Sequence, residues 1–312
     1  MDSRKNGELL KVRLLRTYSD GKFVEEEWTK PEPADTEIEV KAVMTGVCRS
    51  DIDMMTGKFP TLPAHMSGHE GLGIVTKVGG QILNVKEGDY VATRGEPAYA
   101  DYYNVRAREF IVVPSAEPKY ILEPVACGIN IVKQNSTLLQ SKILQLSKCL
   151  IIGSGFLAWV AYNTLKLDYY KFGTIEVWGN SNHELWANEN VLVQEPSYEK
   201  YDVIIDIREH TEVLKRKLLA PQGVWIIAAE KESFTTTFSE LLWNANTIAM
   251  PSPRHNGFYN AMYEAELWVK TNNLKVDTFW TKCYNRNTEW QQAFEDGLNR
   301  PQGYSRGYIK WD

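Results

Sequence analysis

The sequence predicts an α/β protein made of two domains, one rich in β-strands and one built around a parallel sheet. The chain has 312 residues, which is more than a single hydrophobic core usually organises. Before residue 123, Gly, Pro and Asp interrupt the chain often, and no long helical pattern is evident. After residue 123, short apolar runs alternate with helical stretches, which is typical of a parallel sheet with helices on both faces.

The periodicity of apolar residues indicates the individual elements. Residues 37–43 alternate charged and apolar side chains, as a half-buried strand does. A break at Pro251-Ser252-Pro253 precedes an amphipathic helical pattern over 259–270. The other expected strands are 149–153, 174–178, 201–206, 224–228, 246–250 and 308–311, and the other expected helices are 156–166 and 211–219.

Composition argues against several classes of function. The formal net charge is −5, so the chain has no excess of basic residues with which to bind nucleic acid or an anionic membrane. No run approaches the roughly 18 apolar residues that suggest a membrane helix, and residues 1–20 lack the apolar stretch of a secretory signal. We therefore expect a cytoplasmic protein. Its cysteines form no CxxC pair and are interpreted as thiols or metal ligands instead of disulfides.

The segment Gly68-His69-Glu70 is the strongest local signal for chemistry. A catalytic zinc takes about three N, S or O ligands from the protein and leaves one position open for water or substrate. His69 can supply nitrogen, Glu70 can supply oxygen, and Cys48, upstream in the chain, can supply sulfur. Glycines beside these residues allow the backbone to turn tightly and bring the side chains together. Taken separately, His69 also fits an ordinary turn and Cys48 a buried thiol.

These segments resemble those of the zinc-binding medium-chain dehydrogenases/reductases, and in particular the alcohol and sorbitol dehydrogenases. The similar segments occur in the family's order and at comparable spacing. They are Cys48-Arg49-Ser50-Asp51, Gly68-His69-Glu70-Gly71-Leu72-Gly73 with Gly79, Gly88-Asp89-Tyr90-Val91, Tyr99-Ala100-Asp101-Tyr102 and Ile121-Leu122-Glu123-Pro124-Val125-Ala126. The resemblance implies a GroES-like catalytic domain formed by residues 1–124 and 254–312, and a Rossmann nucleotide-binding domain formed by residues 125–253.

The resemblance also implies one catalytic zinc in the first domain. Cys48 and His69 would be ligands, and Glu70 and Glu123 are alternatives for the remaining protein ligand. Many relatives carry a second, structural zinc in a loop with four cysteines. Residues 92–98 stand in that place and include no cysteine, so the ligand count excludes a structural zinc.

Three further residues near the zinc ligands receive catalytic roles from the resemblance. Ser50 stands where the family keeps a hydroxyl that takes the substrate proton. Asp51 would hold the far nitrogen of His69 and fix the orientation of its ring. Glu70, when it is not a ligand, would stand just outside the metal. Where relatives often continue the proton relay with a histidine, this chain has Asp53, which puts the relay beyond Ser50 in question.

Residues 153–158 match the dinucleotide fingerprint GxGxxG with alanine in the last position. The match follows a predicted buried strand and opens a predicted helix, which is the setting that this fingerprint requires. Backbone close to the pyrophosphate and N–H groups at the start of the helix would then bind the phosphates. A tight turn in an ordinary α/β protein is the alternative. The expected cofactor-binding residues here are Gly153, Gly155, Phe156, Leu157 and Ala158.

The next strand, over 174–178, ends without the acidic residue that commonly binds the adenosine ribose of NAD. Gly179 and Asn180 follow it, with Ser181 and His183 beyond, while Glu176 lies earlier within the strand. A missing acid removes repulsion of a 2′-phosphate, but no Arg or Lys stands nearby in the sequence. Either NAD or NADP fits, and we expect a modest preference for NADP. Gly179→Asp is expected to shift the preference toward NAD.

Two arginines are candidates for binding the pyrophosphate. Arg49 follows Cys48, where some members of the family carry such an arginine. Arg306 resembles a C-terminal arginine with the same role. Each is equally compatible with a solvated surface charge.

Together, these residues predict a zinc-dependent oxidoreductase that transfers a hydride between NAD or NADP and an alcohol, a polyol or the matching carbonyl, with zinc as a Lewis acid. Two alternatives stay open: a zinc-independent carbonyl or enone reductase of the same fold, and a non-catalytic binding protein on a decayed dehydrogenase scaffold. The expected partners are a small-molecule substrate and a second copy of the chain. In such a homodimer, an apolar edge strand over 246–250 would pair with its symmetry mate.

Overall fold

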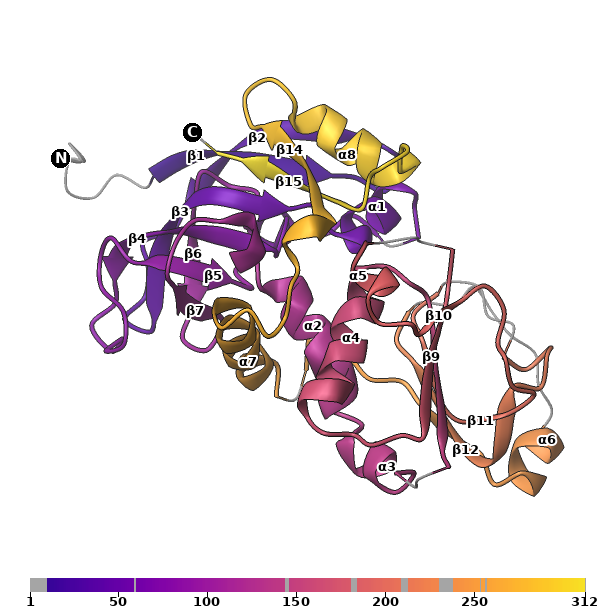
Figure 1. Ribbon diagram of the computed structural model, residues 1–312. Helices are drawn as coiled ribbons and strands as arrows, with labels where there is room; N and C mark the ends of the chain where they lie inside the picture. The colour runs from indigo at the N-terminus through magenta and orange to yellow at the C-terminus, as the bar shows by residue number, and fades with distance from the viewer. Residues whose placement is uncertain are drawn as a thin grey trace. The chain divides into compact units, whose positions relative to one another are not determined.

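The computed structural model describes residues 10–58, 60–143, 146–180, 184–208, 213–229, 238–252, 254–255 and 257–311. The chain divides into two compact units (Figure 1). The first comprises Met1–Pro124 and Met262–Asp312, and the second comprises Val125–Ala261. No helix among the described residues is both long enough and apolar enough to cross a membrane.

The first unit is mainly antiparallel β-structure. Its larger sheet has the strand order β14-β15-β3-β4-β5-β7, and β6 pairs with β3. A separate hairpin joins β1 and β2. The bounds are β1 (Leu10–Thr17), β2 (Phe23–Lys30), β3 (Glu37–Gly46), β4 (Gly71–Val78), β5 (Tyr90–Thr93), β6 (Tyr102–Arg106), β7 (Phe110–Val113), β14 (Trp280–Asn285) and β15 (Arg306–Lys310), with helices α1 (Arg49–Met55) and α8 (Trp290–Asn299) and 3-10 turns at Ala64–Met66, Pro118–Tyr120 and Asp277–Phe279.

Aromatic contacts and the buried ion pair between Lys30 and Glu39 stabilise this unit. The ring of Tyr99 meets that of Phe294, from α8, edge to face at 5.4 Å. Lys30 and Glu39 are fully buried, with Nζ 2.8 Å from the carboxylate. Lys30 also donates to the side-chain oxygen of Asn104 at 2.8 Å, so the buried charge is paired and hydrogen-bonded, as burial of an ion requires.

The second unit is built on a six-stranded sheet with the order β10-β9-β8-β11-β12-β13, and every pairing in it is parallel. This is the strand order of a dinucleotide-binding Rossmann sheet, in which the order reverses beside the first strand. The bounds are β8 (Lys148–Ile152), β9 (Thr174–Trp178), β10 (Leu192–Val193), β11 (Tyr201–Asp206), β12 (Leu219–Ile227) and β13 (Thr247–Ala249), with helices α2 (Glu123–Lys133), α3 (Ser136–Gln140), α4 (Phe156–Leu167), α5 (Glu184–Ala187) and α6 (Phe238–Trp243). Helix α7 (Phe258–Lys270) begins in this unit and continues into the first.

The central strands of this sheet are buried along most of their length. Cys149 to Ile152 of β8 and residues 203–206 of β11 have at most 1% of their surface exposed. A strand covered on both faces reads as a continuous apolar run, which is why the sequence pattern located β8, β9 and β11. The helix expected over 211–219 is wrong in its described part: residues 213–217 form a turn that ends with Lys217 at φ 53°, and β12 begins at Leu219.

The second boundary between the units falls within α7 and not at the proline break. Two side chains connect the chain around the proline break to the second unit. One belongs to α2 and the other to the residue that follows α2. Asn130 donates to the carbonyl oxygen of His255 at 2.7 Å, and Gln134 donates to that of Ser252 at 2.5 Å. The break therefore ends β13 without ending the unit.

Candidate metal centre and nucleotide turn

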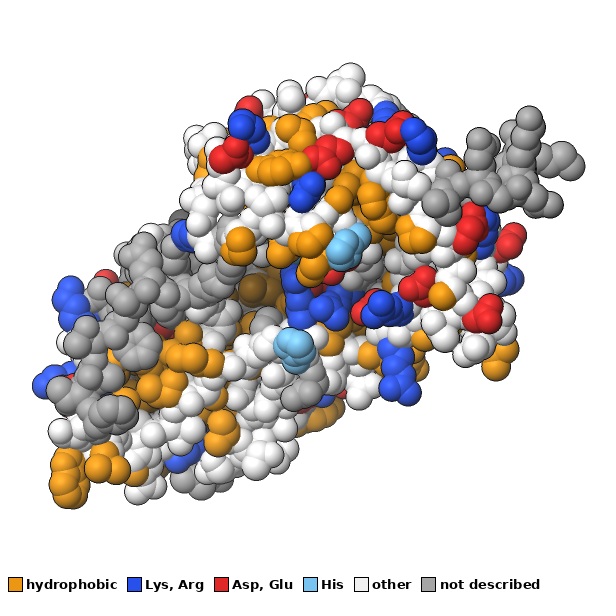
Figure 2. All heavy atoms as spheres, turned by 180° about the vertical axis from the view of Figure 1, so that it is seen from behind, with side chains coloured by type: hydrophobic (Ala, Val, Ile, Leu, Met, Phe, Trp, Pro, Cys, Tyr) orange, Lys and Arg blue, Asp and Glu red, His pale blue; other side chains and the backbone are white. Residues whose placement is uncertain are grey.

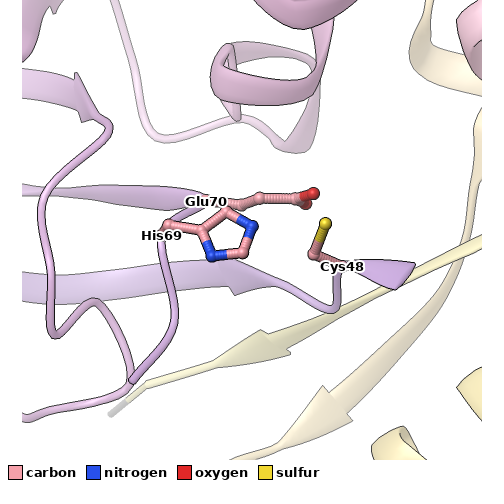
Figure 3. A group of neighbouring side chains, drawn as sticks. All are labelled: Cys48, His69 and Glu70. Carbon is pink, nitrogen blue, oxygen red and sulfur yellow. The ribbon is translucent and has the colours of Figure 1, made fainter. Parts of the chain in front are cut away.

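Three side chains that the sequence indicates for metal binding meet in the first unit. Cys48 precedes α1, while His69 and Glu70 immediately precede β4. Their candidate ligand atoms, a sulfur, an imidazole nitrogen and a carboxylate oxygen, all lie within 4.8 Å of one another. Figure 3 shows a ring nitrogen of His69 facing the sulfur of Cys48 and the carboxylate of Glu70.

Two glycines allow this approach. Gly68 has φ 74°, a conformation in which other residues are strained, and it turns the chain just before His69. Gly46 lies at the end of β3, and its N–H donates to the carbonyl oxygen of Glu70 at 2.9 Å. A Cβ on Gly46 would lie 2.1 Å from a carboxylate oxygen of Glu70. Only glycine at this position leaves room for the Glu70 side chain.

The imidazole of His69 has an unsatisfied nitrogen. The residue is 5% exposed, and its Nε2 has no hydrogen-bond partner among the described residues. Leaving a buried polar atom unpaired costs about 1–3 kcal/mol, so such an atom calls for an explanation, and a bound ion is one. A cation held between this nitrogen, the Cys48 sulfur and the Glu70 carboxylate would satisfy it.

An arginine from the other end of the chain controls the charge of Glu70. Arg306 Nη2 donates to Glu70 Oε1 at 2.6 Å, and the two side chains are 14% and 1% exposed. Burial alone would raise the pKa of Glu70, but the charges of Arg306 and His69 hold that pKa below its ordinary value. Glu70 is therefore an anion at neutral pH. The sequence interpretation assigned Arg306 to a pyrophosphate; the structure places its guanidinium on Glu70.

Asp51 lies in the first turn of α1 and is fixed by two donors. The hydroxyl of Tyr99 donates to its Oδ2 at 2.8 Å, and the N–H of Cys48 does so at 3.2 Å. Burial raises the pKa of Asp51, while the charge of His69 and the bond from Tyr99 oppose that rise. Sequence reasoning did not assign Tyr99 to the site; its signal was membership of the aromatic-Ala-acid-Tyr segment.

The remaining candidates of this unit differ in how close they come to the cluster. The hydroxyl of Ser50 lies 3.4 Å from the sulfur of Cys48, so it reaches the same centre. Arg49 Nε donates to Asp53 Oδ1 at 2.9 Å. Arg49 therefore pairs with the carboxylate of Asp53, the residue that stands where relatives often have the relay histidine. Glu123 is buried at the start of α2, and the three-residue group found among the described residues does not include it.

The glycine motif forms a tight turn between β8 and α4 in the second unit. Gly153 has φ 119°, which only glycine adopts readily. Gly155 caps α4, and a Cβ placed on it would meet nothing within 4 Å. Phe156, Leu157 and Ala158 form the first turn of the helix, whose N–H groups suit an anion. The residues of the motif thus fit the phosphates of a dinucleotide.

The sequence of the first unit is similar to a known domain family. Residues 34–115 match the alcohol dehydrogenase GroES-like domain. An alcohol dehydrogenase from Moraxella sp. is 37% identical over 84 residues, which are 26% of this chain and 25% of that protein. A probable quinone oxidoreductase from Leishmania amazonensis is 28% identical over 117 residues, which are 37% of this chain and 34% of that protein. The chain thus matches only about a quarter to a third of the length of these curated relatives.

Solved structures share the fold over almost the whole chain. An Escherichia coli oxidoreductase/dehydrogenase of unknown specificity has a TM-score of 0.78 at 19% identity, covering 97% of this chain and 100% of that one. A putative zinc-binding dehydrogenase from Sinorhizobium meliloti, bound to NADP, has a TM-score of 0.76 at 16% identity, covering 96% and 99%. The matched domain and the shared fold support placing the chain with the medium-chain dehydrogenases/reductases. The predicted fold class, a GroES-like domain with a Rossmann domain, is confirmed.

The end of β9 bears on the expected effect of Gly179→Asp. A Cβ on Gly179 would lie 2.1 Å from the hydroxyl oxygen of Ser154. Gly179→Asp would therefore press on the glycine turn at Ser154, and its expected shift toward NAD stays a prediction. Asn180, the next residue, is exposed. Ser181 and His183 lie outside the described residues.

Glu176 and Arg208 are two charged side chains near the end of β9. Glu176 is buried and accepts hydrogen bonds from the hydroxyl of Tyr201 at 2.5 Å and the N–H of Ser197 at 3.1 Å. Those bonds exclude it as a ribose acceptor. The sequence offers no cation in the segment after β9, but the fold brings Arg208 there from the end of β11: its Nη2 donates to the carbonyl oxygen of Trp178 at 3.0 Å.

Proposed function

We propose that the protein is a zinc-dependent oxidoreductase that moves a hydride between a nicotinamide dinucleotide and an alcohol, a polyol or the matching carbonyl. One observation carries the proposal: Cys48, His69 and Glu70 converge with their ligand atoms within 4.8 Å, and the buried Nε2 of His69 has no partner among the described residues. One sulfur, one nitrogen and one oxygen donor form a ligand set of the kind found at catalytic zinc. The geometry favours Glu70 over Glu123 as the third ligand.

The residues around the ligands support this assignment. Zinc bound to them would supply a Lewis acid that polarises the substrate oxygen. Arg306 keeps Glu70 ionised, which suits a ligand for a cation. Asp51, held by Tyr99, lies close enough for its charge to interact with that of His69, as an orienting carboxylate would.

Ser50 is the side chain that we propose to take the proton of the substrate alcohol. Its hydroxyl lies 3.4 Å from Cys48 Sγ, so it sits at the centre where the substrate oxygen would be held. A hydroxyl can accept one proton while passing on its own. Asp53, the carboxylate at the family's relay position, is neutralised by Arg49, so we propose that the proton leaves Ser50 directly to water.

The glycine turn is the proposed dinucleotide site. Gly153 provides the turn, and the open space above Gly155 leaves its backbone accessible to a pyrophosphate. The similarity in fold to a dehydrogenase bound to NADP agrees with this proposal. We infer that the cofactor is NADP or NAD and that the phosphates lie on the N-terminus of α4.

Turnover measurements test the function. A panel of alcohols and polyols, assayed with NAD and with NADP, should reveal oxidation that a chelator abolishes and added zinc restores, with circular dichroism confirming that the chelated protein stays folded. Full carbonyl or enone reduction without metal would replace the proposal with the zinc-independent reductase. Absence of both turnover and nucleotide binding would leave the non-catalytic alternative.

We further propose that two copies pair through β13, the last strand of the parallel sheet. Apolar side chains are exposed next to it: Leu242 is 72%, Trp243 84% and Met250 68% exposed. Figure 2 shows hydrophobic side chains on the surface at the end of the second unit that carries α6. An exposed edge strand beside apolar surface favours association, and symmetric pairing would satisfy the free edge.

A further inference from the structure

Two arginines lie against the indole of Trp178, the last residue of β9. The guanidinium carbon of Arg208 is 5.1 Å from the ring centroid and that of Arg216 is 4.9 Å from it. Trp178 is 7% exposed, and its indole N–H donates to the carbonyl oxygen of Gln194 at 2.8 Å. The indole is thus a fixed platform on which cations gain a favourable interaction with the ring face.

Of these two arginines, Arg208 is the one placed at the nucleotide turn. It follows the end of β11, which is separated from β9 by β8 in the sheet. Its side chain therefore crosses the end of β8: the Arg208 Cγ lies 3.8 Å from a Cβ built on Gly153, and Nη2 reaches the carbonyl oxygen of Trp178 at 3.0 Å. The guanidinium consequently lies beside the backbone that leads into Gly179 and Asn180.

Arg216 is the second arginine on this indole. Its Nη1 forms an ion pair with Glu195 at 2.7 Å, and the two side chains are 34% and 69% exposed. This ion pair lies near the surface of the unit. Arg208 and Arg216 thus offer two guanidinium groups on one indole, only one of which is shown to touch the turn.

The chemistry that belongs at this edge of the sheet is the ribose of an adenosine. In a sheet of this order the dinucleotide lies across the carboxyl ends of the strands, with the ribose at the end of the second strand, which here is β9. Glu176 is bonded to Tyr201 and Ser197, and Gly179 and Asn180 bring no charge. The guanidinium of Arg208 lies at this edge, and the one carboxylate of β9, that of Glu176, is engaged by Tyr201 and Ser197.

We propose that Arg208 is the residue that recognises the 2′-phosphate of NADP and makes the phosphorylated dinucleotide the preferred cofactor. The inference rests on the proposed function in one respect, because it requires that the turn at Gly153 binds a dinucleotide. A guanidinium presents several N–H donors in one plane and binds phosphate oxygens in pairs. The backbone N–H of Arg208 donates to the buried carboxylate of Asp206 at 3.2 Å, which fixes the point from which the side chain extends.

Binding of two nucleotides without nicotinamide isolates this step from the redox chemistry. Calorimetric titration with adenosine 2′,5′-bisphosphate and adenosine 5′-monophosphate compares ligands that differ only in the 2′-phosphate. The wild-type protein should bind the bisphosphate more tightly. Arg208→Gln should lose at least about tenfold in affinity for the bisphosphate, which corresponds to about 1.4 kcal/mol, and should bind the monophosphate within about twofold of wild type. Arg208→Lys should lie between the two proteins, because it keeps the charge without the fork.

Arg216→Gln is the matched control, since it removes a guanidinium from the same indole while leaving Arg208 in place. It should leave both affinities unchanged. Equal binding of the two nucleotides by the wild-type protein, an equal loss for both in Arg208→Gln, or an equal effect of Arg216→Gln would overturn the assignment. If NADH binds as tightly as NADPH, and the monophosphate as tightly as the bisphosphate, only the assignment of Arg208 fails. If no adenine nucleotide binds, the proposed dinucleotide site fails as well.

Discussion

At the scale of single residues, the proposed metal centre contains a buried ion pair between Glu70 and Arg306. The carboxylate is 1% exposed and the guanidinium 14%, so water screens neither charge well. Removing one member of such a pair leaves the other as an uncompensated buried charge, which costs far more than losing a surface pair. A metal at the neighbouring Cys48 and His69 would supply a second source of positive charge for Glu70.

Arg306→Gln should therefore destabilise the metal-free protein by about 3–5 kcal/mol. Added zinc should recover part of this loss, because the cation would compensate the charge of Glu70. Urea unfolding with chelator and with zinc measures both effects. Arg106→Gln is the control, because Arg106 is 76% exposed and lies 3.7 Å from its partner Glu37; it should change stability by less than about 0.5 kcal/mol. Equal effects of the two variants would contradict the account.

The three side chains of the candidate metal centre could be predicted from residue types and spacing, but the residues that contact them could not. Cys48, His69 and Glu70 stand in short motifs with glycines, and the structure brings all three together. Arg306 is separated from Glu70 by 236 positions, and a motif contains no information on contacts at that range. Arg208 was missed for the same reason, because its guanidinium acts at the end of a strand to which it does not belong.

At the scale of elements, the glycine turn is held from behind by a buried tryptophan. Trp186, from α5, is 1% exposed, and its indole N–H donates to the carbonyl oxygen of Ser154 at 2.8 Å. Its ring packs edge to face on Trp159 of α4, with centroids 4.9 Å apart. The turn that faces the proposed dinucleotide is thereby fixed both by a hydrogen bond and by packing against the helix that follows it.

Trp186→Phe should loosen the turn, because the carbonyl of Ser154 loses its donor in a buried place. We expect a loss of about 1–3 kcal/mol in stability and weaker binding of NADP and NAD alike. Thermal or urea unfolding, together with nucleotide titration, provides the measurement. Tyr169→Phe, which removes a polar group from a ring that is 80% exposed, is the control and should be neutral. A Trp186→Phe protein with unchanged stability and affinity would argue that the bond does not hold the turn.

Strands that form continuous apolar runs could be predicted from the sequence. Segments whose conformation depends on a turn were predicted less well. β9 and β11 have the bounds that their apolar runs indicated. The expected helix over 211–219 fails where residues 213–217 turn and Lys217 takes a positive φ. Its apolar positions belong instead to a loop and the start of β12, since Val213, Leu218 and Leu219 pack into the core under the sheet. A helical spacing of apolar residues cannot distinguish these two ways of burying them.

At the scale of the whole molecule, the proposed dimer predicts a specific response to charge. Met250 follows β13 directly and is 68% exposed. In a symmetric pair, each substitution at the interface acts twice, because the same surface occurs on both subunits. Light scattering should give the mass of a dimer for the wild-type protein, and Met250→Lys should shift it toward monomer. Leu83→Lys, at a side chain 92% exposed in the first unit, should stay dimeric. A wild-type monomer at micromolar concentration would refute the pairing.

The metal content of the purified protein tests the central claim most directly. Elemental analysis without chelator should find about one zinc per chain, the content of a single catalytic site. Cys48→Ser should lose most of that zinc, whereas Cys283→Ser, which replaces an exposed thiol, should retain it. Only a small fraction of one equivalent in the wild-type protein after zinc supplementation, or equal zinc in both serine variants, would contradict a metal centre at Cys48, His69 and Glu70.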